Sequence, residues 1–234
     1  MSQNGQIQPS TLPGTKEMEA RTRGLAAIAM VSFALMVLIL IAFHFIQPEL
    51  NPLKRFGSEY AAGRLGWLMN VGFFSFAAGL ASLAIAFGHS LQPPARSRGA
   101  GVLLGLSSLG ILGSGLFNSD LQGTQPVSVS MILHSLSGFL AFLTMIPAMI
   151  LLSRRVHLAK PLRGIRPVLL RYFPWLVLIL FLAGLFVFEP LKLDGLGQRL
   201  FLTVMFTWLL AAAHAIRSGA FVPLTETSGA TDER

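Results

Sequence analysis

The sequence contains no cysteine and few charged residues among its 234 positions. Without cysteine there are no disulfide bonds, thiolate metal ligands, attachment points for c-type haem or cysteine nucleophiles. Charged residues make up 12% of the chain and hydrophobic residues 53%, whereas about 25% of a soluble domain is charged. This composition predicts a membrane protein.

Six apolar runs are close to the roughly 20 residues that a helix needs to cross the hydrocarbon. They cover residues 25–46, 66–87, 99–117, 130–152, 172–188 and 200–216. The first run is longer than the core of a signal peptide, about 7 to 15 residues, and no Ala-x-Ala cleavage site comes directly after it. We therefore predict an all-α, polytopic membrane protein with a six-helix bundle over residues 25–217. The tails, residues 1–24 and 218–234, are expected to be disordered.

The loop from Phe117 to His134 is the one connection between apolar runs that contains no Lys or Arg. Six helices place 13 of the 18 Lys and Arg residues on the side of the termini and 5 on the side of this loop. Because Lys- and Arg-rich loops stay in the cytoplasm, we predict cytoplasmic termini in a multi-pass protein of the plasma (inner) membrane. The net charge of +8 is then explained by orientation and by membrane lipids as partners. No nucleic-acid partner is expected, because no recognition motif accompanies the charge, and no protein partner is indicated.

Small residues predict where the helices approach one another. Gly101 and Gly105 in the third run, and Ser75 and Gly79 in the second, have the spacing that allows close contact between helix backbones. We therefore expect close contacts at both pairs and a central place for the glycine-rich third helix. The fifth run is mostly Leu, Phe, Ile and Val and is predicted to face lipid.

Polar residues gather at the outer face, which is the side of the bundle opposite the termini. His44 ends the first helix, Ser58 and Glu59 lie in the first outer loop, Asp120 ends the third helix, and His134 begins the fourth. These five are the candidate ligand-binding residues. His134 should lie about one turn inside its helix, where a polar group needs a partner, and we predict Asp120 as that partner.

Several functions are compatible with these five residues. Helix ends need polar caps, so the main prediction is a non-catalytic role, or binding of a lipid or small ligand. The alternative is a metal-dependent hydrolase acting on lipid or headgroup substrates. Its metal ligands would be His44, Asp120 and His134, and its candidate catalytic residues Glu59, Asp120 and His134, with Glu59 as general base.

Haem binding and coupled transport are two further functions to compare with the sequence. A haem between His44 and His134 is another alternative, although the sequence identifies no cofactor. Coupled transport is disfavoured, because charged residues lie at the ends of the runs or in loops rather than near the membrane midplane.

A resemblance to a known family rests on several of these residues. The shared features are His44 with Pro48, Ser58-Glu59 with Gly63, Phe117 with Asp120, and His134. In these features the chain resembles the bacterial six-helix membrane proteins catalogued as domain of unknown function 998, from about the first helix to the sixth. It departs from the family pattern at Asn118 and Leu121, where proline is often found. The resemblance implies the fold and emphasises Ser58, Glu59, Asp120 and His134, but it implies no reaction, because the family has no settled activity.

Overall fold

The computed structural model describes residues 13–90, 97–155 and 166–219, which form helices joined by loops. Six of these helices are long and apolar enough to cross a membrane. They are α1 (Pro13–Ile46), α2 (Gly66–Ser90), α3 (Arg98–Leu116), α4 (Val129–Ser153), α5 (Arg166–Ala183), which the π-helical turn η3 (Gly184–Phe188) continues, and α6 (Asp194–Arg217). A short 3-10 helix, η1 (Gly57–Ala62), lies between α1 and α2. The predicted all-α class and the six apolar spans are confirmed.

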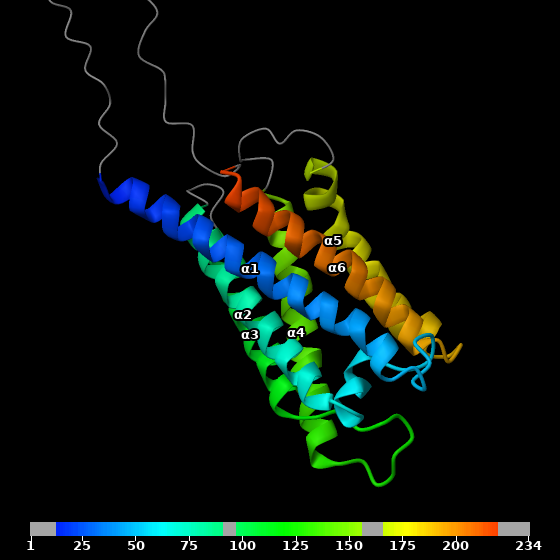
Figure 1. The fold of residues 1–234 in the computed structure, drawn as a ribbon. Coiled ribbons are helices and arrows are strands. Elements are labelled where there is room, and N and C mark those ends of the chain that lie inside the picture. The colour runs from blue at the N-terminus through cyan, green and yellow to red at the C-terminus, as the bar shows by residue number, and fades with distance from the viewer. Residues whose placement is uncertain (1–12, 91–96, 156–165, 220–234) are drawn as a thin grey trace, which may run out of the picture.

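The helices follow one another around the bundle in the order of the sequence. Each packs against the next, and α6 closes against α1 (Figure 1). The first helix begins and the last helix ends at the same end of the bundle, which we call the terminal end (Figure 1). The opposite end, the loop end, carries η1 and the loop between α3 and α4. The outer-face candidates of the sequence analysis all belong to the loop end.

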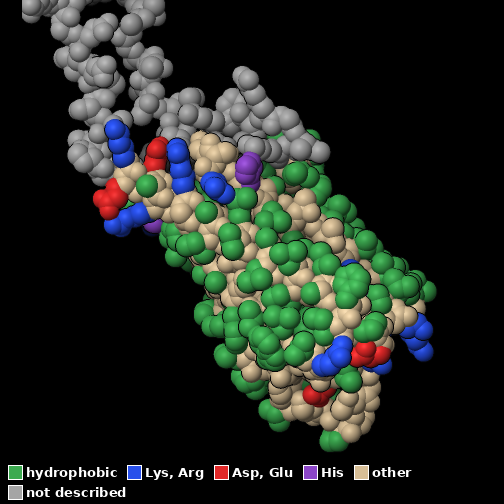
Figure 2. Space-filling model, in the orientation of Figure 1, with side chains coloured by type: hydrophobic (Ala, Val, Ile, Leu, Met, Phe, Trp, Pro, Cys, Tyr) green, Lys and Arg blue, Asp and Glu red, His purple; other side chains and the backbone are tan. Residues whose placement is uncertain are grey.

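The surface of the bundle is divided into an apolar middle and polar ends. Figure 2 shows hydrophobic side chains over the middle of the visible face, with Lys, Arg, Asp and Glu gathered mainly towards the two ends. Side chains of this kind exposed over so large an area are costly in water and favourable in a bilayer. The surface therefore agrees with the six apolar spans in indicating a membrane protein.

The first helix begins earlier than the sequence predicted. It has 34 residues, about 51 Å at 1.5 Å per residue, and so exceeds a hydrocarbon layer of about 30 Å. Residues Lys16 to Gly24, which we expected in a disordered tail, are helical. Two ion pairs one turn apart, Arg21 to Glu17 at 2.7 Å and Arg23 to Glu19 at 3.6 Å, support these exposed turns. The rest of the predicted tails, residues 1–12 and 220–234, lies outside the described residues.

Two aromatic clusters hold α6 against the other helices. Phe206 packs on Phe33 of α1 and Phe76 of α2, with ring centroids 6.3 and 4.8 Å away. Phe201 packs on Phe142 of α4 and Phe181 of α5, at 5.0 and 5.7 Å. Because lipid is as apolar as these side chains, close packing rather than water exclusion favours the association.

The close contact predicted at Ser75 and Gly79 is confirmed. The Ser75 hydroxyl donates to the Ser32 carbonyl of α1 at 3.0 Å. A Cβ added at Gly79 would lie 2.6 Å from the Phe33 ring. Glycine is therefore needed at position 79 for α1 and α2 to pack as closely as they do.

The contact predicted at Gly101 and Gly105 is wrong. A Cβ at either position would meet nothing within 4 Å, whereas one at Gly110 would lie 2.6 Å from the Ser137 carbonyl of α4. The third helix packs mainly against α2 and α4, so it is not central, and α2, which also touches α6, lies closer to the middle. The spacing of small residues correctly predicted that another helix packs closely against α3. It did not predict which face of α3 makes the contact.

The fifth helix is the least buried of the six spans, as predicted. Pro174 lies inside it and has no N–H to donate to the carbonyl of Leu170 one turn before. The Trp208 indole of α6 donates to that carbonyl at 3.1 Å. A side chain of the neighbouring helix thus supplies the hydrogen bond that proline removes.

Candidate functional site

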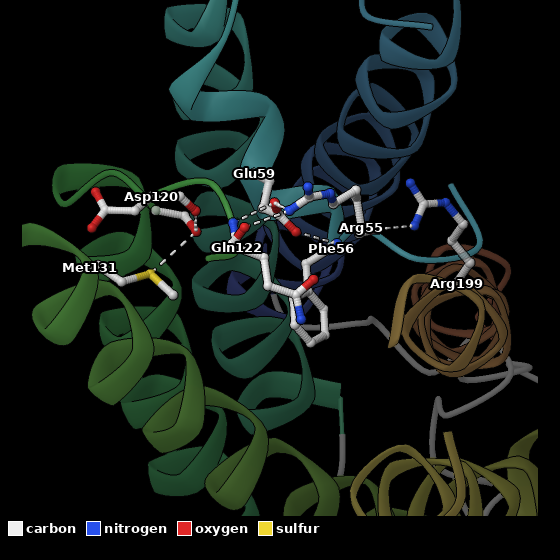
Figure 3. Close-up of polar contacts among 8 residues, drawn as sticks. Arg55, Phe56, Glu59, Asp120, Gln122, Met131 and Arg199 are labelled. Atoms are coloured by element: carbon white, nitrogen blue, oxygen red, sulfur yellow. Dashed lines mark hydrogen bonds and ion pairs between the residues drawn. The ribbon is translucent and has the colours of Figure 1, made fainter. Parts of the chain in front are cut away.

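Glu59 is the most buried charged residue in the described part of the chain, at 1% exposure. One carboxylate oxygen accepts from the backbone N–H of Phe56 at 2.8 Å, and the other from that of Gln122 at 2.9 Å and from Arg55 Nη1 at 3.3 Å. Arg55 also donates to the Gln122 carbonyl at 2.8 Å (Figure 3). Glu59 and Arg55 together therefore join the α1–α2 connection to the loop between α3 and α4.

The local sequence explains how Glu59 reaches this position. It is the third residue of η1, and its bond back to Phe56 satisfies an N–H that the start of a helix leaves without a partner. Burying a carboxylate is costly unless it is paired and hydrogen-bonded. Two backbone donors and one guanidinium meet that requirement here.

Arg199 connects α6 to the same region. Its Nε donates to His44 Nε2 at 3.1 Å, and Nη1 donates to the carbonyls of Arg55 at 2.8 Å and Gly195 at 3.1 Å. Nη2 donates to the Tyr60 hydroxyl at 3.0 Å. Figure 3 shows Arg199 reaching from α6 to the Arg55 backbone. One guanidinium thus holds the loop ends of α1, η1 and α6 together, and all four of its acceptors are neutral.

Both ring nitrogens of His44 are engaged. Nδ1 lies 2.8 Å from the Leu40 carbonyl, and since a carbonyl only accepts, Nδ1 carries the proton. Nε2 is then the acceptor that receives the Arg199 hydrogen bond. The imidazole is neutral in this arrangement, and its tautomer is fixed by its two neighbours.

Asp120 shapes the start of α4. Its carboxylate accepts from the backbone N–H and from the hydroxyl of Ser128, both at 2.9 Å. The Ser128 hydroxyl in turn accepts from the Met131 N–H at 3.0 Å as the N-cap of α4. Asp120 therefore holds Ser128, the N-cap residue of α4, in position.

His134 is 7% exposed, as expected for a residue one turn inside α4. Its Nδ1 lies 3.0 Å from the Ser114 carbonyl and 2.8 Å from the Phe117 carbonyl, and it donates to both. These carbonyls lie at the C-terminal end of α3, where helix carbonyls have no partner in their own helix. The predicted pairing of His134 with Asp120 is wrong. The Asp120 carboxylate accepts hydrogen bonds from Ser128 instead, and the His134 imidazole donates to the carbonyls at the end of α3.

The five candidate residues are divided among different interactions. His44 and Glu59 belong to one network through Arg55 and Arg199, whereas Asp120 and His134 serve the junction of α3 and α4. Ser58 is partly buried, and the hydrogen bonds of the described residues do not include its side chain. No group of three or more His, Asp or Glu residues in the described ranges is placed to hold a metal ion. The structure thus does not bring His44, Asp120 and His134 together, and the metal and haem sites stay predictions.

Sequence reasoning missed several residues of the network. Gln47, 1% exposed, donates to the carbonyls of Tyr60 at 3.0 Å and Arg64 at 2.7 Å. Gln198 accepts from the Gly57 N–H at 2.6 Å. The apolar run over residues 200–216 leaves Arg199 in the preceding loop, but α6 begins at Asp194. The available sequence signal for these residues was the pair Gln198-Arg199, which stands directly before the last apolar run.

Six apolar spans with a hydrogen-bonded polar network at one end define a polytopic membrane protein. A family model described as a protein of unknown function (DUF998) matches residues 27–215, and the chain belongs to this family. The family expected from the sequence is thereby confirmed. No curated protein and no solved structure matches the chain.

Proposed function

We propose that the chain is an integral plasma-membrane protein with a non-catalytic role, which binds a lipid or another small ligand at its outer face, and that the loop end is this outer face. The main support is Glu59, whose two oxygens are both engaged by donors of the chain itself. A general base must reach the proton that it removes from a substrate. A carboxylate enclosed in this way suits a structural role better than an acid–base role.

Lipid as the ligand is supported by where the network lies. The polar residues of the loop end begin where the apolar surface of the bundle stops (Figure 2), so they lie at the depth of the headgroups. Charged and hydrogen-bonding groups at this depth are the ones that recognise headgroups. The proposed ligand site is therefore part of the membrane boundary rather than a cleft open to water.

The proposed orientation, with both tails in the cytoplasm, is supported by the distribution of basic residues and has a direct test. A reporter active only in the cytoplasm should be active when fused after Arg234. The same reporter should be inactive when inserted directly after Gly123, between Gln122 and Thr124. The insertion is the matched control, because it lies at the opposite end of the bundle. A C-terminal fusion that is extracytoplasmic would overturn the orientation.

Ligand binding is tested by native mass spectrometry of the full chain released from detergent. The expected result is phospholipid bound in stoichiometric amount, and wild-type protein that neither retains nor rebinds lipid would overturn the proposal. Metal analysis of the same sample tests the non-catalytic role. Stoichiometric metal that is lost in Asp120→Ala would overturn that role in favour of the hydrolase.

A further inference from the structure

Arg199 is a partly buried cation that forms no ion pair with a carboxylate of the described residues. The ion pairs in the described ranges join Arg21 to Glu17, Arg23 to Glu19 and Arg55 to Glu59. The two carboxylates that the loop-end interactions use, those of Glu59 and Asp120, are engaged by other groups. Arg199 therefore forms no ion pair with a described carboxylate within 4 Å, and its charge is solvated by neutral acceptors.

An arginine cannot relieve this situation by losing its proton, because a guanidinium stays charged at any physiological pH. A cation at the depth of the headgroups is attracted to anionic lipid. Arg55, whose carbonyl accepts from Arg199, adds no compensation, since it is itself a cation and Glu59 already balances it. An anion from outside the described chain would complete the site.

The hydrogen bonds of Arg199 leave room for such an anion. A guanidinium has five N–H groups. Nε uses one on His44, Nη1 uses two on the carbonyls of Arg55 and Gly195, and Nη2 uses one on Tyr60. One Nη2 N–H has no acceptor among the described residues. A full positive charge and one free donor therefore lie on the same group.

The position of Arg199 indicates which anion is available. It lies five residues after the start of α6, about 7.5 Å along the helix. Leu200, which follows it, is exposed, and so is Phe45, which follows its partner His44 and is 80% exposed. Because these neighbours face lipid, the guanidinium lies next to the lipid-facing surface at the loop end, where the anionic group is the phosphate of a phospholipid.

We propose that Arg199 binds the phosphate of a phospholipid, with His44 and Tyr60 as positioning residues that hold the guanidinium at the surface. This inference rests on the proposed function and names the ligand class of the outer-face site. An anionic headgroup is preferred over phosphatidylcholine, since it brings no second positive charge towards Arg199 and Arg55. Free phosphate offers similar oxygens, and the experiment separates the two sources.

The experiment follows thermal unfolding of the full chain in detergent with added phosphatidylglycerol, phosphatidylcholine or inorganic phosphate. Phosphatidylglycerol should stabilise the wild type most, and Arg199→Gln should lower its apparent affinity at least about tenfold, as expected for loss of a charge-assisted hydrogen bond. The matched control is Arg64→Gln. Arg64 is an exposed arginine of the same end whose Nη2 donates to the Ile46 carbonyl, and the variant should keep the wild-type response.

Each outcome bears on a different claim. A wild type and an Arg199→Gln variant that respond equally to phosphatidylglycerol would overturn this inference and leave the proposed function standing. Inorganic phosphate that reproduces the whole response would overturn the assignment to lipid. A wild type that binds no lipid at all would defeat the proposed function itself. Should Arg199→Gln fail to fold, native mass spectrometry of the wild type with both lipids decides, because equal occupancy by phosphatidylcholine overturns the preference for an anionic headgroup.

Discussion

Arg55 and Arg199 lie at the same end of the bundle, and the Arg55 carbonyl accepts a hydrogen bond from Arg199 at 2.8 Å, yet their charges are balanced differently. Arg55 faces the buried carboxylate of Glu59, whereas Arg199 has four neutral acceptors. The first arginine closes an interaction within the fold. The second forms four hydrogen bonds but no ion pair, which leaves its charge for the proposed lipid phosphate. Hydrogen bonding and charge balance are thus separate properties, and only the second distinguishes a structural cation from a binding one.

The largest effect is expected from Glu59→Ala, which would leave Arg55 without its carboxylate. The N–H groups of Phe56 and Gln122 would lose their acceptor as well, and we expect a loss of about 3 kcal/mol in unfolding free energy. The measurement is denaturant or thermal unfolding in detergent. Glu49→Ala is the control, because Glu49 is an exposed acid at the same end, and its change should stay within about 0.5 kcal/mol. A Glu59→Ala protein as stable as the wild type would mean that the carboxylate does not hold the two loops together.

A smaller effect is expected from His134→Ala, which acts outside both arginine sites. Two carbonyls at the end of α3 would lose their donor and a small cavity would form, so unfolding free energy should fall by about 2 kcal/mol. The response to phosphatidylglycerol should be unchanged. His89→Ala removes an exposed histidine and should have little effect on stability. A lipid response that disappears in His134→Ala would place this histidine in the ligand site and contradict the comparison.

The smallest effect on stability is expected from His44→Glu, which would give Arg199 the carboxylate that it lacks. We expect a gain of about 1 kcal/mol without lipid, together with a weaker response to phosphatidylglycerol, because the site would be balanced from within. His44→Gln is the control: it keeps a neutral acceptor and should keep most of the response. The comparison between the arginines fails if His44→Glu responds to lipid as the wild type does.

The six spans could be predicted because long apolar runs are a local property of the sequence. The burial of His134 was predictable for the same reason, since its depth follows from its place in an apolar run. The partner of His134 was not predictable. It depends on how the end of α3 meets α4, and Asp120, the nearest acid in sequence, is engaged by the cap of α4.

The joining of Glu59 to Gln122 also escaped prediction, because 63 positions separate them and two helices must pack before they meet. Arg199 was missed for a different reason. A span defined as an unbroken apolar run leaves out the charged residues at its ends. The first turns of α6, which contain Asp194 and Arg199, were therefore assigned to a loop. Residues at which a membrane helix leaves the hydrocarbon are therefore the ones whose role depends most on the three-dimensional structure.

The bond from Trp208 to the Leu170 carbonyl has a consequence for how this chain can change over generations. While Pro174 is present, replacing Trp208 by a residue without a side-chain N–H leaves a buried carbonyl unpaired. Once Pro174 is replaced by a residue with an N–H, the helix supplies its own donor and the indole is dispensable. The two positions, in different helices, therefore form an epistatic pair. The order of substitution decides whether the intermediate sequence is stable, and the path that changes Pro174 first is the easier one.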